Sequence, residues 1–159
     1  MEVCVNLKSG DYTCHRLDVC PSHEWVPFNG KCYYFDGAKF SADENDELCE
    51  GLEAKPVRVD NEEVYSFLRS ELSRRDLARV WIGANDKDVE GEWVWGPGEP
   101  VSFTGWRNGE PNSNNGDEDC VIMKRSGWVD ISCSMKLPSS ACETSYKIST
   151  LSTYTTLEP

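Results

Sequence analysis

The segment Glu110-Pro111-Asn112, followed by 117–120 (Asp-Glu-Asp-Cys) and by Trp128-Val129-Asp130, is the most informative part of the sequence. Calcium prefers six to eight oxygen ligands, which carboxylate and amide side chains supply. A cis bond before Pro111 would turn the two flanking side chains the same way, since cis is energetically cheap only for X-Pro bonds. Any one of these acids alone is typical of a solvated surface. Their combination predicts a calcium site formed by Glu110, Asn112, Glu118 and Asp130.

This segment lies in a long stretch between Trp95 and Cys120 that shows neither helical nor strand periodicity and is rich in Gly, Pro, Asn and acids. Loops longer than about 15 residues are usually either functional or disordered. Trp106 lies within the stretch and a cysteine closes it, which favours an ordered, functional loop. The tryptophans of this region are more typical of loop and core anchors than of a sugar-stacking surface, because aromatic rings bury large areas.

Two helices are predicted before the loop. Ser41 and Glu44 form a capping-box pattern, and Cys49 then falls on an apolar face, so it is expected to point into the core. The second helix is expected at about 61–72, because apolar side chains recur there at helical spacing. Those side chains are Val64, Phe67, Leu68 and Leu72.

Short β-type runs complete the pattern. The Asn29-Gly30 pair lies between two apolar runs and predicts a tight hairpin. Beyond Leu77 the helical period disappears, and strands are expected where β-branched and aromatic residues gather. These runs are 80–82, 93–95, 120–123 and 127–129.

The eight cysteines include no Cys-x-x-Cys pair, which argues against zinc ribbons and thioredoxin-like sites. Stable disulfides need an oxidising environment, so a secreted or extracellular domain is expected. The first residues, Met1 to Cys4, lack the pattern of a signal peptide, and we interpret Met1 as the start of a mature domain. An apolar run of about 18 residues is also absent from the sequence, so no membrane span is expected.

Charge and motif content exclude several functions. The 159 residues contain 16 basic and 28 acidic side chains, which gives a net charge of −12. Such a chain repels phosphate backbones and anionic lipids, so no nucleic-acid partner is expected. The sequence contains no Gly-x-Ser-x-Gly, no His-Glu-x-x-His and no phosphate-binding loop. We therefore expect a binding protein and not an enzyme.

Taken together, the order and spacing of these motifs resemble the C-type lectin-like domain, over the range 20–143. The resemblance is to the long form of the domain, with an N-terminal disulfide hairpin, and to the mannose-type Glu-Pro-Asn motif. It implies an α+β fold in which two helices pack on small antiparallel sheets beside a long calcium-binding loop region. Eight cysteines alone permit 105 pairings. The resemblance implies bridges between Cys20 and Cys32, Cys49 and Cys142, and Cys120 and Cys133.

In that family a sugar completes the coordination of the calcium ion through two neighbouring hydroxyl groups. The resemblance implies that Glu110 and Glu118 accept hydrogen bonds from these hydroxyls and that Asn112 donates one, with Asp130 completing the site. Glu-Pro-Asn is the type that prefers mannose, fucose or N-acetylglucosamine, whereas galactose-type members usually carry Gln-Pro-Asp. Glycans of the mannose type are the expected partners, and calcium the expected cofactor.

One position departs from the family pattern. Val129 stands where the family usually has an asparagine that binds both calcium and sugar, and valine can do neither. A lost hydrogen bond to a charged group costs about 1.5–3 kcal/mol, so weak sugar binding is expected. The alternative is a lectin-like domain that binds protein, ice or mineral independently of sugar.

A second acidic cluster occurs at Asp86, Glu90 and Asp119. It begins like an EF-hand loop, but Pro97 stands at the position that requires a bidentate glutamate. By resemblance these three residues match an auxiliary calcium site of the family, although Ser113 replaces a further acid expected there. A solvated acidic loop is the alternative reading.

Both ends of the chain lie outside the resemblance. Residues 1–19 form a polar arm with two extra cysteines, Cys4 and Cys14, and residues 144–159 form a tail rich in Ser and Thr. Cys4 and Cys14 either pair with each other or cross-link two chains into a homodimer. We expect the intrachain pair.

Overall fold

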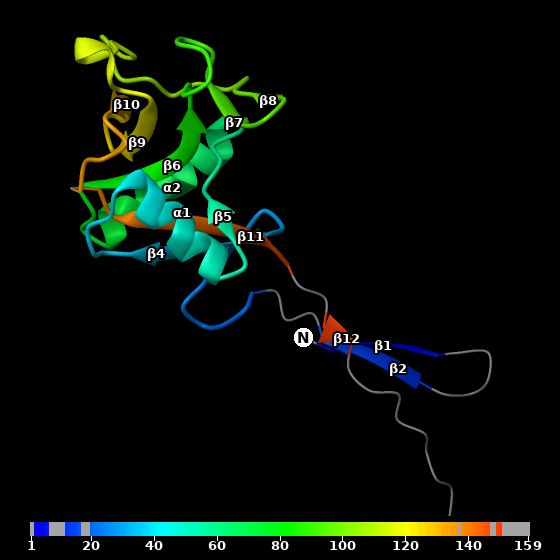
Figure 1. The fold of residues 1–159 in the computed structure, drawn as a ribbon. Coiled ribbons are helices and arrows are strands. Elements are labelled where there is room, and N and C mark those ends of the chain that lie inside the picture. The colour runs from blue at the N-terminus through cyan, green and yellow to red at the C-terminus, as the bar shows by residue number, and fades with distance from the viewer. Residues whose placement is uncertain (1, 7–11, 17–19, 137, 147–148, 151–159) are drawn as a thin grey trace, which may run out of the picture. The chain divides into compact units, whose positions relative to one another are not determined.

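The computed structural model describes residues 2–6, 12–16, 20–136, 138–146 and 149–150. The chain divides into two compact units, one formed by Met1–Cys32 with Ser145–Pro159 and the other by Tyr33–Thr144. The second unit contains both helices and the five-stranded sheet, whose strand β10 (Gly127–Ile131) includes Asp130 of the predicted calcium site (Figure 1). Its architecture is α+β, as predicted.

Helix α1 (Ala42–Gly51) begins at the predicted cap. The Ser41 hydroxyl accepts a hydrogen bond from the Glu44 backbone N–H at 3.3 Å, and a Glu44 carboxylate oxygen accepts one from the Ser41 N–H at 2.8 Å. These bonds satisfy backbone donors that a helix start leaves unpaired. Cys49 is fully buried on the inner face of the helix, which confirms its predicted orientation.

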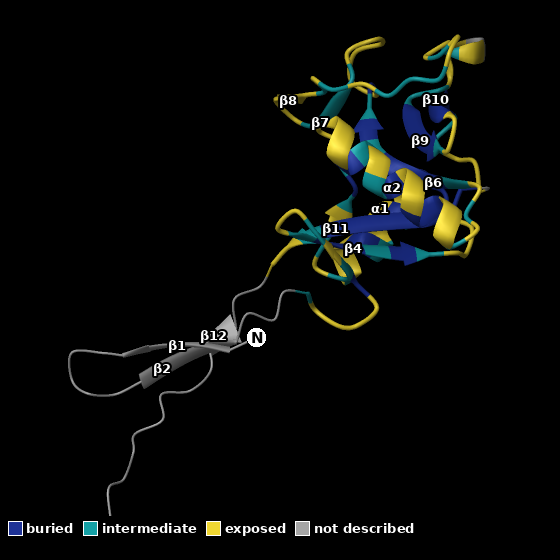
Figure 2. Ribbon diagram, turned by 180° about the vertical axis from the view of Figure 1, so that it is seen from behind, coloured by how far each residue is buried: buried dark blue, intermediate teal, exposed yellow. Residues whose placement is uncertain are grey.

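Helix α2 (Glu62–Arg74) begins after Asn61, whose side chain accepts a hydrogen bond from the Val64 N–H at 3.0 Å. The helix is longer at its C-terminal end than the predicted range 61–72, because its last turn ends on polar residues that an apolar period cannot reveal. Leu68 and Leu72 are fully buried. The opposite face of α2 is exposed (Figure 2).

The larger sheet has the strand order β10-β9-β6-β7-β8, and its described pairs are antiparallel. It contains every strand predicted beyond Leu77, with β7 beginning one residue later than expected. The register between β6 and β9 shifts between Ile82 and Asn85, just before Asp86. The strands are β6 (Arg79–Asn85), β7 (Val94–Gly96), β8 (Glu99–Pro100), β9 (Cys120–Lys124) and β10 (Gly127–Ile131).

A four-stranded sheet has the order β3-β4-β11-β5. Asn29 and Gly30 both have positive φ, 43° and 78°, and form the predicted turn between β3 (Val26–Phe28) and β4 (Lys31–Asp36). Sequence patterns did not reveal the other two strands, because most of their residues are small or polar and one is a proline. These are β5 (Lys55–Pro56) and β11 (Ser140–Ser145).

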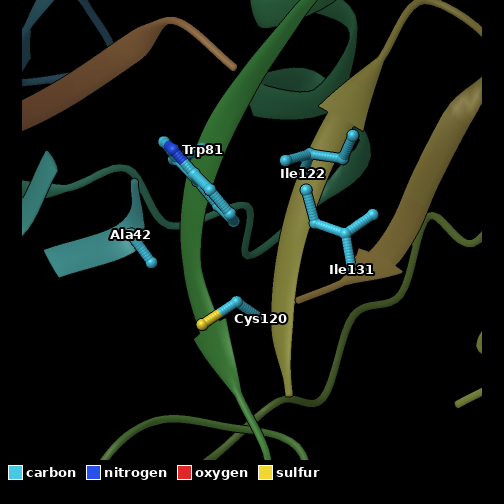
Figure 3. Close-up of a cluster of buried hydrophobic side chains, with 5 residues drawn as sticks. All are labelled: Ala42, Trp81, Cys120, Ile122 and Ile131. Carbon is cyan, nitrogen blue, oxygen red and sulfur yellow. The ribbon is translucent and has the colours of Figure 1, made fainter. Parts of the chain in front are cut away.

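A cluster of buried apolar side chains joins α1 to the larger sheet (Figure 3). Trp81 is its largest member, and its indole N–H donates a hydrogen bond to the Phe40 carbonyl at 2.8 Å. This bond removes the cost of burying a polar group inside the core. The cluster consists of Ala42, Trp81, Cys120, Ile122 and Ile131.

The three disulfides expected from the resemblance are formed. Cys49–Cys142 links α1 to β11, with a Cα–Cα distance of 5.5 Å. Cys120–Cys133 links the start of β9 to the segment after β10, at 5.1 Å. Cys20–Cys32 closes the N-terminal hairpin at 5.4 Å. These distances lie in the ordinary range for disulfides.

In the first unit, β1 (Glu2–Asn6), β2 (Tyr12–Arg16) and β12 (Ser149–Thr150) form a three-stranded sheet. The register places Cys4 opposite Cys14. The side chains of these cysteines lie outside the described residues, so their pairing stays a prediction. Among the described residues, no helix is long and apolar enough to cross a membrane.

Candidate functional site

The loop that carries Glu110 is attached to strand β10 by backbone hydrogen bonds. The Arg107 N–H donates to the Trp128 carbonyl at 2.9 Å, and the Trp128 N–H donates to the Gly105 carbonyl at 2.8 Å. Trp106 and Trp128 form an isolated parallel bridge between these segments. The long loop is therefore ordered, as predicted, and follows the strand that contains Asp130.

Tryptophan rings fix the same loop from its inner side. The Trp106 ring lies 5.0 Å from that of Trp93 and 5.5 Å from that of Trp128, both edge-on. Trp95 contacts Trp128 at 5.9 Å, and Trp128 itself is fully buried. Such pairs contribute about 0.5–1.5 kcal/mol each beyond their buried area. These rings act as anchors of the loop, which agrees with the sequence interpretation.

Gly105 allows the loop to approach the core closely. A Cβ atom at this position would lie 2.7 Å from Tyr65 Cε2 and 3.0 Å from the Trp128 indole nitrogen. Real side chains do not tolerate such contacts without a shift of their neighbours. The residue at 105 therefore has to be glycine for the loop to keep this position.

Asp130 lies at the centre of the candidate site and is fully buried. Both of its carboxylate oxygens accept a hydrogen bond from the Asn112 backbone N–H, each at 3.1 Å, and one also accepts from the Ser113 N–H at 2.7 Å. A carboxylate held by backbone N–H groups is a strong acceptor. Asp130 thus holds the backbone that follows the Glu-Pro-Asn motif.

Glu110 and Asn112 lie on either side of a cis Glu110–Pro111 bond, as predicted. The Asn112 side-chain amide donates to one Glu110 carboxylate oxygen at 2.6 Å, and Arg107 donates to the other at 3.0 Å. The Glu110 side chain is only 5% exposed. The structure therefore brings an amide donor and a carboxylate acceptor together.

The pKa of Glu110 is raised above its ordinary value. Burial is the main cause, the adjacent Asp130 carboxyl adds to it, and Arg107 partly opposes it. Two carboxylates placed together in this way repel each other when both are ionised. A cation between them would remove that repulsion.

Glu118 faces a different partner. Its carboxylate accepts a hydrogen bond from the Asn114 backbone N–H at 2.8 Å, at the short 3-10 helix η1 (Asn114–Gly116). Among the described residues, only Asp86, Glu90 and Asp119 gather closely enough to share a metal ion, so the carboxylates of Glu110, Glu118 and Asp130 do not form such a group by themselves. Hydrogen bonds connect Asn112 to both Glu110 and Asp130, whereas Glu118 lies on the neighbouring turn.

Val129 contributes no polar atom to the site. It is half-buried between Trp128 and Asp130 on β10 and packs against the core cluster around Trp81 and Ile122. Its apolar side chain therefore supports the sheet and offers no hydrogen-bonding group at this point of β10.

The second acidic cluster is compact. Carboxylate oxygens of Asp86, Glu90 and Asp119 lie within 4.8 Å of one another. One Asp86 oxygen accepts a hydrogen bond from the Gly91 N–H at 2.7 Å, while the other is buried without a hydrogen-bond partner. Burial raises the pKa of Asp86, and the nearby Glu90 and Asp119 charges raise it further.

Both groups of residues fit calcium by their chemistry. Oxygen-only ligands suit a hard cation better than zinc or copper, which favour nitrogen and sulfur. The orphaned buried oxygen of Asp86 is the strongest sign of a missing partner, because such atoms are rare in folded proteins. The neighbouring carboxyl groups of Glu110 and Asp130 likewise favour a bound cation, which would offset their mutual repulsion.

A polar groove of about 620 Å³ borders the second cluster. It includes Asp119 and the Cys133 side of a disulfide, but neither Glu110 nor Asp130 lines it. This groove is therefore separate from the group formed by Glu110, Asn112 and Asp130.

Sequence reasoning missed two contributions to the site. Arg107 binds Glu110, and the Ser113 backbone N–H binds Asp130 across 17 positions of the chain. Only the folded loop brings these groups together. The charge of Arg107 three residues before Glu110 is the one local signal for the first contact.

Comparison with known proteins identifies relatives of this arrangement. A family model described as Lectin C-type domain matches residues 38–144. The chain is 35% identical over 127 residues to the low affinity immunoglobulin epsilon Fc receptor of Mus musculus, covering 79% of this chain and 37% of the receptor. It is 38% identical over 122 residues to C-type lectin domain family 17, member A, of Homo sapiens, covering 76% and 31%.

The chain thus spans about a third of the length of these two curated relatives. Among solved structures, the cow C-type carbohydrate-recognition domain of CD23, determined in the presence of a GlcNAc2Man3 oligosaccharide, superimposes with a TM-score of 0.72 at 33% identity. That match covers 79% of this chain and 95% of the cow domain. It agrees with the fold expected from the sequence.

Proposed function

The chain belongs to the C-type lectin domain family, and from this membership and the geometry of its loop we propose that it binds glycans in a calcium-dependent manner. The family consists of non-enzymatic binding domains that often bind calcium. The observation that carries the proposal is the contact between Asn112 and Glu110 beside the buried Asp130. It supplies a donor and two acceptors within a few ångströms.

Each of these residues has a distinct role in the proposed site. Glu110 accepts a hydrogen bond from one sugar hydroxyl and Asn112 donates one to it, while Glu118 accepts from the neighbouring hydroxyl. Asp130 holds the backbone at Asn112 and Ser113, so the motif keeps its shape. Calcium, when bound, offers coordination positions that two neighbouring sugar hydroxyls complete. The site is proposed to include Glu110, Asn112, Glu118 and Asp130 as metal and sugar ligands.

The order of donor and acceptor supports a mannose-type preference. Glutamate precedes the cis proline and asparagine follows it, and neither is exchanged for the Gln and Asp that galactose-type domains usually carry. We therefore assign mannose, fucose or N-acetylglucosamine as the sugar class. Val129 removes one calcium oxygen and one donor to the sugar, so we expect about tenfold or greater weakening relative to a complete site.

A second, auxiliary calcium ion is proposed at Asp86, Glu90 and Asp119. These three carboxylates lie beside the start of β9, and the Asp86 N–H donates to the Asp119 carbonyl at 3.2 Å. This bond connects the auxiliary cluster to the segment that carries Glu118. Occupation of the cluster would fix that segment next to the sugar site.

The environment of the domain follows from its chemistry. Its disulfides are typical of extracellular proteins, so we place the domain outside the cell, facing glycans. One site binds weakly, and useful avidity requires several copies. We propose residues 20–143 as the binding domain and the 1–19 arm, with Cys4 and Cys14, as the segment in which copies would be linked if these cysteines pair between chains.

Retention on sugar-coated beads tests the proposal. In millimolar calcium we expect the protein to bind mannose, fucose or N-acetylglucosamine beads more than galactose beads, and to elute with excess EDTA. Glu110→Gln should lose retention, because the amide replaces an acceptor and a metal ligand. Glu50→Gln is the matched control, since Glu50 is exposed on α1 outside the site.

Two results would count against this function. Equal retention in calcium and in EDTA would exclude calcium as the link to the sugar. Absence of retention for every sugar, with calcium still binding by calorimetry, would favour the alternative of a domain that recognises protein, ice or mineral.

A further inference from the structure

A second groove lies in the unit Tyr33–Thr144, along the outer side of α2. It has a volume of about 530 Å³ and is lined by Ser66, Arg69, Ser70 and Ser73 from the helix and by Arg125 from the β9–β10 turn. We call it the α2 groove. None of its residues belongs to the proposed sugar site around Glu110 or to the acidic cluster around Asp86.

The groove combines two guanidinium groups with three hydroxyls. On α2 its residues follow the spacing i, i+3, i+4 and i+7 and all are exposed, so they form one stripe along the helix. Seven residues of helix extend about 10 Å. The stripe is therefore long enough to contact more than one group of a ligand.

Arg69 is held in place but not neutralised. Its guanidinium carbon lies 5.6 Å from the centre of the Tyr65 ring, a cation–π contact, and the residue is exposed. Among the described residues, Arg69 makes no ion pair with an acidic side chain. Arg125 has one acidic neighbour, Asp76, at 3.7 Å, and that aspartate is almost wholly exposed.

Arg69 and Arg125 differ in charge from most of the surface of this acidic protein. The chain carries a net charge of −12, and its other described cations include several held in close ion pairs, such as those of Arg74 and Arg75 with Glu71. Two arginines that face one groove create a local site where an anion is attracted despite the field of the whole protein. One guanidinium group can donate two parallel hydrogen bonds to two oxygens of a sulfate or phosphate group.

We propose that the α2 groove binds a sulfated oligosaccharide, independently of calcium. Arg69 and Arg125 bind sulfate groups, and the hydroxyls of Ser70 and Ser73 bond to the sugar hydroxyls between them. The Ser66 hydroxyl donates to the Glu62 carboxylate at 3.4 Å, so it contributes as an acceptor. A sulfated sugar and free inorganic sulfate or phosphate both present a tetrahedral oxyanion. A free ion, however, would use only one end of the stripe. The length of the stripe and its hydroxyls favour an extended ligand that carries hydroxyls of its own.

The test uses the full chain in EDTA, so that failure of the calcium site cannot affect it. The probes are a heparin-derived tetrasaccharide, its desulfated counterpart, inorganic sulfate and inorganic phosphate, measured by calorimetry and by amide chemical shifts. We expect only the sulfated tetrasaccharide to bind appreciably, with shifts at residues 66–73 and 124–126. Binding should weaken as salt rises, because exposed charges are screened.

Single variants locate the site. Arg69→Gln and Arg125→Gln should each weaken binding about tenfold, the scale of one lost charged hydrogen bond. Lys55→Gln removes the same charge from an exposed position on β5 and should change the affinity less than about twofold.

The proposal is overturned if the tetrasaccharide does not bind, or if Lys55→Gln weakens it as much as the arginine variants do. It is also overturned if inorganic sulfate or phosphate binds as tightly as the tetrasaccharide, which would indicate a free-ion site. If the arginine variants fail to fold, wild-type shifts that lie outside 66–73 and 124–126 would overturn it equally.

Discussion

The carboxylate of Asp130 accepts the Asn112 backbone N–H through both of its oxygens at 3.1 Å, although the two residues lie 18 positions apart. This contact connects a buried strand residue to the loop that carries the Glu-Pro-Asn motif. A proposed metal ligand is thus also a structural support of the site. Loss of Asp130 should consequently disturb both stability and binding.

We expect Asp130→Ala to lower the free energy of unfolding by about 2–3 kcal/mol in EDTA. The change leaves the N–H groups of Asn112 and Ser113 without their charged acceptor inside the protein. Urea denaturation measures the loss. The control Asp88→Ala removes an exposed acid and should change stability by less than about 0.5 kcal/mol. Equal stability of the Asp130 variant and wild type would refute the supporting role.

Val129→Asn should strengthen sugar binding by about tenfold in calcium, because it adds an oxygen and an N–H donor. The same change removes an apolar contact with the core cluster, so stability should fall by about 1 kcal/mol. Val129→Thr is the matched control, since it keeps the volume without the amide. An equal gain in affinity from threonine would contradict the explanation.

Asp86→Asn should raise the melting temperature in EDTA. Burial, followed by the charges of Glu90 and Asp119, raises the pKa of Asp86 above 3.8. A raised pKa in the folded state means that the folded protein binds the proton more tightly, so stability falls as pH rises above that value. The amide has no charge and avoids this penalty at neutral pH.

The same variant tests the auxiliary site. Calcium should raise the melting temperature of wild type more than that of Asp86→Asn, because ligand binding stabilises the folded state only where a site exists. Differential scanning fluorimetry in EDTA and in calcium gives both values. An identical calcium shift for the two proteins would remove Asp86 from the metal ligands.

The acid limit of stability depends in part on Glu71. Burial alone would raise its pKa, but hydrogen bonds from Arg74 and Arg75 bring it below the usual 4.5. Because this pKa is lowered on folding, the contribution of Glu71 is present above about pH 4.5 and is lost as pH falls through the folded value. Glu71→Gln should cost stability at pH 7, and the difference from wild type should shrink below about pH 4.5.

Urea denaturation in EDTA across this pH range measures the effect. Glu50→Gln, on the exposed face of α1, controls for the loss of one acid. A difference between Glu71→Gln and wild type that stays constant down to pH 3 would contradict the assigned role.

Local signals in the sequence were sufficient for the helices, the central strands and the Glu-Pro-Asn loop. The Ser41 cap, the Asn61 side chain and the tryptophan-rich strands each act through neighbours in the chain. The disulfide pairing came from resemblance, because cysteine count alone does not choose a connectivity.

Long-range contacts were not predictable in this way. Strand β11 consists mostly of small and polar residues, and it becomes a buried strand only because β4 and β5 lie beside it. The contacts of Arg107 with Glu110 and of Ser113 with Asp130 arise only after the loop folds onto β10. Glu118 matches the motif in sequence, yet in the structure its carboxylate turns to the Asn114 N–H.

The most direct test of calcium-dependent sugar binding follows the Asn112 amide signals by NMR during addition of methyl α-mannoside. In calcium, the account predicts that the backbone and side-chain N–H signals of Asn112 shift in a saturable way, and that excess EDTA abolishes the effect. Methyl galactoside should produce smaller shifts at the same concentration. Shifts that persist in EDTA, or signals of Asn112 that stay unchanged while calcium is bound, would contradict the central claim.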